Sequence, residues 1–310
     1  MSVIKDALIA SAVGEAMGVP VKSIKRSILL NNPVTSMISN DLEEGVWSYN
    51  TSISLATMDS IIKCNKLDYD DMAKRYCFFM NNHEYCAIQE LFDIDETIKK
   101  SLNRFLEEKI DAVKCGGKGF NDNSNGSLNR MLPIALYCHF NKLKEDEVFD
   151  VVRDASSITH ASDVCILGCF IFVNYLLFLL NGKDKYASYS MVKCIDYSLY
   201  FDSDIIEYYN RLLKTNINNL RVEDLKSSDY IVYSLEAILW ITLNCTSYAE
   251  SVVGAINLGD ATDSIGYACG SIAGILYGYE AIPNKWLDKL KRLDYLEDIA
   301  FHFEGALHLR

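Results

Sequence analysis

The sequence predicts an all-α protein that forms one compact domain. Apolar residues recur at intervals of three and four along most of its 310 residues, which is the period of an amphipathic helix. Only four prolines occur, and no run of alternating apolar and polar residues is long enough to predict a strand. No Gly/Ser linker, low-complexity block or short repeat divides the chain. We therefore expect a single domain over residues 1–310, with about ten to fourteen helices.

The predicted helices follow one another with short polar breaks. The segment “IKDALIASAVGEAMG” comes first, and Asn50 or Thr51 is the expected cap of the second, “TSISLATMDSIIKC”. Pro133 stands in the first turn of “RMLPIALYCHF”, where its missing N–H costs nothing. The other segments with this period are “DDMAKRYCFFMNN”, “DETIKKSLNRFLEEKIDAV”, “EDEVFDVVRDASSI”, “YIVYSLEAILWITLN” and “YAESVVGAIN”.

The most apolar segment, “VCILGCFIFVNYLLFLL”, covers residues 164–180 and approaches the lower length limit for a membrane span. It contains Asn174, and the flanking sequence is polar. We interpret it as the buried central helix of a large helical domain, and we expect no membrane partner.

Composition and charge exclude several classes of function. A net charge of −12 leaves no basic face for nucleic acid and argues against adhesion to anionic membranes. The ten cysteines contain no CxxC pair, and we expect Cys165 and Cys169, one helical turn apart, to be buried. The first segment mixes Lys, Asp and Glu into its apolar positions, unlike a signal peptide. We therefore expect a cytoplasmic protein without disulfides.

Polar islands interrupt the apolar helices, and each one leads into a helix start. The four larger islands are “GEAMGVPVK”, “GVWSYNTS”, “CGGKGFNDNSNGSLNR” and “NLGDATDSIG”, and the smaller ones are “FDIDET” and “ITHASD”. Loops that open several helices of a bundle can converge on one site at one end of it. The alternative for each island is a capped helix start with no ligand.

In order and wording, these islands resemble the ADP-ribosylglycohydrolase family, which includes dinitrogenase-reductase-activating glycohydrolase and crystallin J1. The resemblance begins at “IKDALIASAVGEAMGVPV”, continues through “SNGSLNRMLPIAL” and “ITH”, and ends at “NLGDATDSIGYACGSIAGILYGYEAIPNKWL”. It implies an all-α fold whose central cleft binds ADP-ribose and, in active members, two Mg²⁺ ions. The implied partner is an ADP-ribose-type small molecule or an ADP-ribosylated protein.

The resemblance also implies metal ligands that this chain lacks. Where active relatives carry Thr-Asp-Asp, this sequence has Ser48, Tyr49 and Asn50. A phenol stays protonated near neutral pH and cannot replace a carboxylate as an Mg²⁺ ligand.

The last island departs in the same direction. The family pattern Gly-Gly-Asp-x-Asp-Thr/Ser has Ala261 at its first aspartate, although Asp260 stands one position earlier. The oxygen groups left for a metal are Ser48, Asn50, Asp260, Asp263 and Ser264.

The first island adds a positive charge. Relatives read Gly-Asp-x-x-Gly-x-Pro-x-Glu, and the final glutamate is associated with catalysis. Here Glu15 replaces the aspartate and Lys22 replaces the glutamate. Lys22, Tyr49 and Ala261 are thus degenerate positions, so we assign no catalytic residue and expect Mg²⁺ only if the site still functions.

The ligand-binding surface implied by the resemblance survives better. The stretch from Ser124 to Ser127 matches a loop that cradles the diphosphate and the distal ribose, and His160 matches a histidine near the ribose. Phe120 and Tyr267 are candidate adenine-stacking residues, although such aromatic groups are most often core. The predicted ligand contacts are Lys22, Ser48, Tyr49, Asn50, Asp122, Asn123, Ser124, Asn125, Gly126, Ser127, His160 and Asp263.

Two further departures lie beside this surface. Asn129 replaces the methionine that usually precedes the arginine, here Arg130. Asp95 and Glu96 replace a Gly-Asn pair and put carboxylates near a site expected to receive phosphates.

Three hypotheses follow. The first is a protein that has lost hydrolysis and binds, or sequesters, an ADP-ribose or cyclic ADP-ribose type of nucleotide. The second is an active ADP-ribosylglycohydrolase with an altered Mg²⁺ site. The third is a structural, crystallin-like protein, which would have lost the “SNGS” loop as well. We favour the first, and the Tyr-rich segment over residues 184–210 is a candidate assembly surface for an oligomer.

Overall fold

The computed structural model describes residues 2–91 and 93–308 as an all-α fold, which confirms the predicted class. No strand occurs within these residues, and two isolated β-bridges join Gly117 to His160 and Ser124 to Tyr230. Phe92, the first residue of “FDIDET”, lies outside the described residues. The α-helices are α1 (Val3–Gly18), α2 (Arg26–Leu29), α3 (Tyr49–Cys64), α4 (Tyr69–Asn82), α5 (Glu96–Glu108), α6 (Met131–Phe140), α7 (Glu145–Ser157), α8 (Asp163–Leu180), α9 (Lys185–Lys193), α10 (Ser203–Glu207), α11 (Asn210–Lys214), α12 (Ile231–Asn244), α13 (Tyr248–Asn257), α14 (Thr262–Tyr277), α15 (Asn284–Leu287) and α16 (Leu293–His308). The 3₁₀-helices are η1 (Val19–Val21), η2 (Ala112–Lys114), η3 (Phe120–Asp122), η4 (Leu128–Arg130), η5 (Tyr197–Leu199), η6 (Ile217–Asn219), η7 (Val222–Asp224) and η8 (Tyr279–Ala281).

The expected number of helices was too low, because the described residues contain 16 α-helices. Helices α2, α10, α11 and α15 span only four or five residues, too short to show a helical period. The expected cap of α3 was also wrong, since the helix begins at Tyr49 with Ser48 before it. The predicted helix “DETIKKSLNRFLEEKIDAV” ends at Glu108, because Lys109 adopts a left-handed conformation with φ of 53°.

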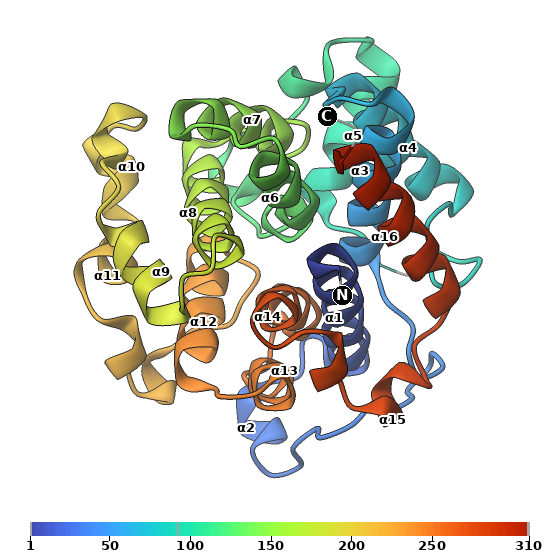
Figure 1. Ribbon diagram of the computed structural model, residues 1–310, viewed down its shortest axis with the longest axis vertical. Coiled ribbons are helices and arrows are strands. Elements are labelled where there is room, and N and C mark those ends of the chain that lie inside the picture. Colours follow the sequence, from blue (N-terminus) through green and yellow to red (C-terminus); the bar gives the residue numbers. More distant parts are fainter. Residues whose placement is uncertain (1, 92, 309–310) are drawn as a thin grey trace.

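Helices α1 and α14 form the centre of the fold and lie side by side, dark blue and orange-red in Figure 1. Their backbones touch where two glycines meet. A Cβ added to Gly14 would lie 2.1 Å from the carbonyl oxygen of Gly266, and one added to Gly266 would lie 2.4 Å from that of Gly14. No side chain larger than hydrogen fits between them. This contact brings the C-terminal end of α1 beside the N-terminal end of α14.

Helix α8 is the apolar segment that the sequence singled out. It is long and apolar enough to cross a membrane, but 78% of its 18 residues are buried inside the protein. It packs against α6, α7, α9 and α12 (Figure 1), so the prediction of a buried central helix is confirmed. Cys165 and Cys169 are buried on it, and all ten cysteines are free.

Five of the six predicted islands lead into helix starts, as expected, but the first island forms the end of α1 and η1. These five precede α3, α5, α6, α8 and α14. The Tyr-rich segment folds as α9, η5 and α10 and reaches the first residue of α11, where Tyr189, Tyr197 and Tyr209 are buried and Tyr186 is exposed. Its role in assembly stays a prediction.

Candidate functional site

A buried carboxylate from α1 organises the start of α3. Glu15 accepts hydrogen bonds from the main-chain N–H groups of Asn50 (3.1 Å) and Thr51 (2.9 Å). It also accepts from the hydroxyls of Ser48 (2.6 Å) and Thr51 (2.5 Å). Burial raises the pKa of Glu15, and these donors act against that shift. A negative group at a helix N-terminus satisfies free N–H groups, so Glu15 acts as the cap of α3.

Asn50 joins this carboxylate to the predicted phosphate loop. Its Nδ2 donates to Glu15 Oε1 (2.8 Å), while its Oδ1 accepts from Asn129 Nδ2 (3.0 Å). All three residues are almost completely buried. An aspartate at position 50 could not donate to Glu15 and would put a second carboxylate beside it. Asn50 and Asn129 therefore form a neutral connection, at positions where the family resemblance implies an aspartate and a methionine.

Lys22 places an ammonium group inside the site. Its Nζ lies 3.0 Å from Asp263 Oδ2, contacts Asp93 Oδ2, and stands 5.3 Å from the centre of the Tyr49 ring. The Asp263 side chain is fully buried and that of Lys22 is 34% exposed. Burial alone would lower the pKa of Lys22, but Asp263, Tyr49 and Asp93 outweigh it and raise this pKa above its ordinary value. The group stays charged at neutral pH and compensates the buried Asp263 carboxylate.

The other residues at the expected metal position supply no free carboxylate that could bind Mg²⁺. Tyr49 is buried, its hydroxyl lies 3.4 Å from Ser264 Oγ, and burial raises its pKa well above the ordinary value. Ala261 offers no ligand atom in its side chain. Asp260 pairs with the exposed Lys25 (2.7 Å), so its carboxylate is engaged outside the buried cluster.

These residues do not fit a pair of Mg²⁺ ions. The Lys22 ammonium is in contact with the buried Asp263 carboxylate, and Mg²⁺ binding would bring further positive charge beside it. Within residues 2–91 and 93–308, no group of three or more His, Cys, Asp or Glu side chains is placed to hold a metal ion.

The predicted phosphate loop is fixed by the segment before α12. The N–H of Asn125 donates to the carbonyl of Asp229 (2.7 Å), and that of Ile231 donates to the carbonyl of Asn123 (3.0 Å). Its buried polar side chains point to protein partners. Asn125 Nδ2 donates to Ser234 Oγ (2.8 Å), and Ser127 Oγ lies 3.3 Å from Cys169 Sγ. These side chains shape the loop, and a ligand contact through them stays a prediction.

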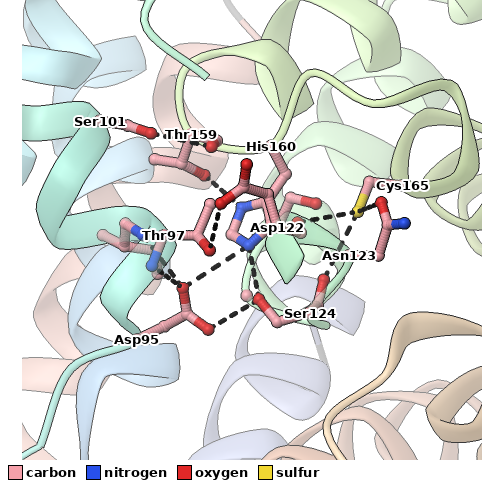
Figure 2. Close-up of polar contacts among 12 residues, drawn as sticks. Asp95, Thr97, Ser101, Asp122, Asn123, Ser124, Thr159, His160 and Cys165 are labelled. Atoms are coloured by element: carbon pink, nitrogen blue, oxygen red, sulfur yellow. Dashed lines mark hydrogen bonds and ion pairs between the residues drawn. The ribbon is translucent and has the colours of Figure 1, made fainter. Parts of the chain in front are cut away.

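Figure 2 shows a polar chain that crosses the site from α5 to the loop before α8. Ser124 Oγ donates to Asp95 Oδ2 (2.7 Å) and lies 2.7 Å from His160 Nε2. Since the single Ser124 proton goes to Asp95, the Nε2–H of His160 donates to Ser124. The Nδ1 of His160 then accepts from Thr159 Oγ1 (2.7 Å). Burial lowers the pKa of His160 to about 4, although Asp95 acts in the opposite direction, and this fits the neutral ring.

Asp95 was predicted to bring negative charge near the phosphates, and the structure gives it a local role. It caps α5 by accepting from the N–H groups of Thr97 (2.8 Å) and Ile98 (3.0 Å). Asp122 accepts from the N–H of Gly119 (2.8 Å) and from the Thr97 hydroxyl (3.3 Å). Glu96 lies exposed in the first turn of α5.

A buried arginine lies below the loop. Arg130 donates to the carbonyls of Gly126 (3.3 Å), Ala155 (2.9 Å) and Ser156 (3.1 Å), and no ion pair joins it to a carboxylate within the described residues. Gly126 is required by a close approach, because a Cβ there would lie 2.9 Å from His160 Cε1. Arg130 therefore ties the loop to the end of α7 and leaves a positive charge beneath it.

The two candidate stacking residues differ. Tyr267 is fully buried and its hydroxyl lies 2.7 Å from Ser54 Oγ, so it is a core residue, the alternative given for such aromatic groups. Phe120 is 78% exposed on η3, two residues before Asp122. Its exposed ring remains a candidate for stacking.

The structure thus brings Lys22, Tyr49, Asn50, Asp263 and Ser264 into one cluster, and Ser124 and His160 into another. Asp93 is the contact that sequence reasoning missed. Its signal was present, because “FDIDET” contains two aspartates and Lys22 needed a partner. The spacing alone did not say which carboxylate would face the lysine.

Comparison with known proteins agrees with this architecture. The sequence model of the ADP-ribosylglycohydrolase family matches residues 2–309. This chain belongs to that family. An ADP-ribosylglycohydrolase-related protein complex contains a chain of the same fold, with a TM-score of 0.81 and 22% identity over 98% of both chains.

Three relatives of this chain carry the names of hydrolases. ADP-ribosylarginine hydrolase Tri1 of Serratia proteamaculans is 26% identical over 96% of this chain and 77% of its own length. The Pseudomonas putida protein of the same name is 28% identical over 96% of this chain and 76% of its own. ADP-ribosyl-[dinitrogen reductase] glycohydrolase of Rhodospirillum rubrum is 23% identical over 92% of this chain and 88% of its own.

Proposed function

We propose that this protein binds an ADP-ribose-containing or cyclic ADP-ribose-type nucleotide without a metal pair and releases it uncleaved. One observation carries the proposal. The Lys22 ammonium contacts the buried Asp263 carboxylate at 3.0 Å, where active relatives gather metal ligands. A side chain of this protein thus supplies the compensating positive charge. The nucleotide needs no metal to bind if Lys22 also meets one of its anionic or hydroxyl oxygens.

The proposed loss of hydrolysis follows from the side chains available at the site, none of which is a free carboxylate base. Cleavage of a glycosidic bond requires an activated water or another nucleophile, supplied by a carboxylate base or by a metal ion. Lys22 stands at the position where the family resemblance implies a catalytic glutamate, and a protonated ammonium cannot accept a proton from water. Tyr49 and Asn50 are neutral, and Glu15 is occupied by the start of α3.

Retention of the ligand surface supports binding over a structural role. The loop from Ser124 to Ser127 is held by Asn125 and Arg130 in one conformation, and His160 lies against it. Preorganised loops bind more tightly, because less conformational entropy is lost when the ligand arrives. Phe120 adds an exposed aromatic ring next to this loop.

One observation favours hydrolysis as the second candidate. Asp263 is fully buried and its Oδ1 has no hydrogen-bond partner within the described residues. An unpaired carboxylate oxygen beside Ser264 would accept a single cation, and the named relatives are hydrolases.

Calorimetric titration with ADP-ribose and cyclic ADP-ribose separates the two candidates. We expect equal affinity in EDTA and in excess Mg²⁺, and chromatography of the recovered nucleotide should show it intact. Lys22→Glu, which restores the family's glutamate, should weaken binding in EDTA. Binding that requires Mg²⁺, or a nucleotide recovered in pieces and protected by Asp263→Asn, would establish the hydrolase instead.

A further inference from the structure

A depression in the surface adjoins the Lys22 end of the site. Its inner part, of about 240 Å³, is lined by Lys22, Ser23 and Ala261, and its outer part, of about 430 Å³, by Lys226. Lys25, Ser228 and Asp260 line both parts, so the two parts adjoin each other. We call the two parts together the rim pocket. None of the ligand contacts predicted from the sequence, apart from Lys22, lies in it.

The floor of the rim pocket is held rigidly. Ser23 and Asp260 both adopt left-handed conformations, with φ of 65° and 59°, which few residues other than glycine adopt. Their backbones are joined by Ser23 N–H donating to the Asp260 carbonyl (2.8 Å). Arg26 fixes the surrounding loops by donating to the carbonyls of Leu258 (2.9 Å) and Leu225 (3.0 Å). Backbone strain that the structure maintains in this way is concentrated at functional sites.

Positive charge is in excess on the outer part. No ion pair joins Lys226 or Arg26 to a carboxylate within residues 2–91 and 93–308. Lys25 is paired with Asp260, and Asp229 is the other carboxylate on the lining. The Nζ of Lys226 lies 3.1 Å from the Tyr233 hydroxyl and 4.5 Å from the centre of its ring. In a chain of net charge −12, a local excess of ammonium and guanidinium groups favours an anion.

The rim pocket and the predicted phosphate loop lie on either side of one short segment. The segment from Ser227 to Tyr230 runs between the two, because Ala261 N–H donates to the Ser227 carbonyl (2.9 Å) and Asn125 N–H donates to that of Asp229 (2.7 Å). A ligand that lies on the loop and passes Lys22 therefore meets the rim pocket next.

We propose that the rim pocket binds a phosphate group carried by the nucleotide on the ribose farther from adenine. Lys25 and Lys226 supply the ammonium groups, and the hydroxyls of Ser23 and Ser228 lie on the same lining. This inference rests on the proposed function, in which Lys22 meets an oxygen of the nucleotide, and it adds that this oxygen belongs to the distal ribose. It narrows the ligand from ADP-ribose in general to an ADP-ribose with an added negative charge at its distal end.

The test compares three nucleotides by calorimetry in EDTA. ADP-ribose 1″-phosphate carries the extra phosphate at the distal end, ADP-ribose 2′-phosphate carries it on the adenosine side, and ADP-ribose lacks it. We expect the 1″-phosphate to bind at least about tenfold more tightly than the other two, the effect of one charge-assisted hydrogen bond. The gain should disappear in Lys25→Ala/Lys226→Ala and persist in Lys66→Ala, an exposed lysine beyond the far end of α3 from Tyr49.

The outcomes separate this inference from the function on which it rests. If ADP-ribose binds but the 1″-phosphate gains nothing, or gains as much in the double variant, the rim pocket is no phosphate site. If no nucleotide binds, both proposals fail. The last titration uses inorganic phosphate alone. If phosphate binds to the wild type and not to the double variant, while no nucleotide binds, the rim pocket is an anion site separate from any nucleotide site. That result would refute the inference as stated.

Discussion

The contact between Lys22 and Asp263 makes a prediction about stability. In Lys22→Met the aliphatic stem is retained and the ammonium is lost, which leaves Asp263 buried without its cation. Breaking a buried ion pair costs about 3–5 kcal/mol, whereas an exposed pair is worth about 0–1 kcal/mol. Because the side chain of Lys22 is 34% exposed, we discount the buried value and expect the free energy of unfolding to fall by about 2 kcal/mol.

Urea denaturation at pH 7 in EDTA measures this change directly. Removal of the buried charge should restore most of the loss in Lys22→Met/Asp263→Asn, since the double-mutant cycle isolates the pair. Lys22→Met should also become more stable when Mg²⁺ is added, while the wild type should not. Lys114→Met, which removes an exposed ammonium, is the control and should change nothing measurable. If Lys22→Met were as stable as this control, Lys22 would not be the cation that compensates Asp263.

Three further variants test the rest of the structure. Gly266→Ala should destabilise the protein by about 3 kcal/mol or more in the same urea assay, because the added Cβ would overlap the Gly14 carbonyl; an unchanged midpoint would mean that α1 and α14 can move apart. The pKa of His160 is lowered from 6.5 to about 4, so the unfolded chain binds more protons between these values. Stability should therefore fall as the pH drops from about 6.5 towards 4, by at most about 1.4 kcal/mol per pH unit, and His160→Gln should flatten this slope unless another group causes it. Phe120→Ala should leave stability unchanged, since the ring is exposed, and should weaken ADP-ribose binding about tenfold or more if the ring stacks on adenine; a change in stability without a change in affinity would place Phe120 in the fold instead.

Much of the fold followed from periodicity and end signals. Helices α1, α3, α6, α8 and α12 were predicted close to their observed bounds, because each has many apolar residues at the helical period. The short helices were missed, since one turn contains too few residues to repeat. Helix α16 has apolar residues at the helical period but was not among the predicted segments.

The sequence predicted which residues lie at the site, but not which groups they bind there. Lys22, Tyr49 and Ala261 were identified as departures from the family pattern. Glu15 was identified only as a further substitution, with no structural role. The structure shows Glu15 capping α3 with both carboxylate oxygens. That role depends on the distance between two helices joined by some thirty residues, which include η1 and α2, and no local pattern records that distance.

Asp260 and Tyr267 are the converse case, because the sequence offered them as site residues and the structure gives them other partners. Both are suitable residue types close to a motif, and both have other partners, Lys25 for Asp260 and Ser54 for Tyr267. A left-handed backbone at Asp260 turns its side chain towards the surface lysine. Side-chain direction is set by backbone conformation and packing, so a position in a motif gives only the neighbourhood.

The glycine contact between α1 and α14 also bears on how the chain reaches its native state. The Thr262 hydroxyl donates to the Gly18 carbonyl (2.7 Å) across 244 residues of sequence, and the site lies at this junction. Contacts between such distant segments form late and slow folding, because the loop between them must close first. During synthesis, α1 is made long before α14, so the glycine surface that contacts α14 stays uncovered until then. A chain shortened before α14 would lack the helix that packs against α1, and with it the junction at which the site lies.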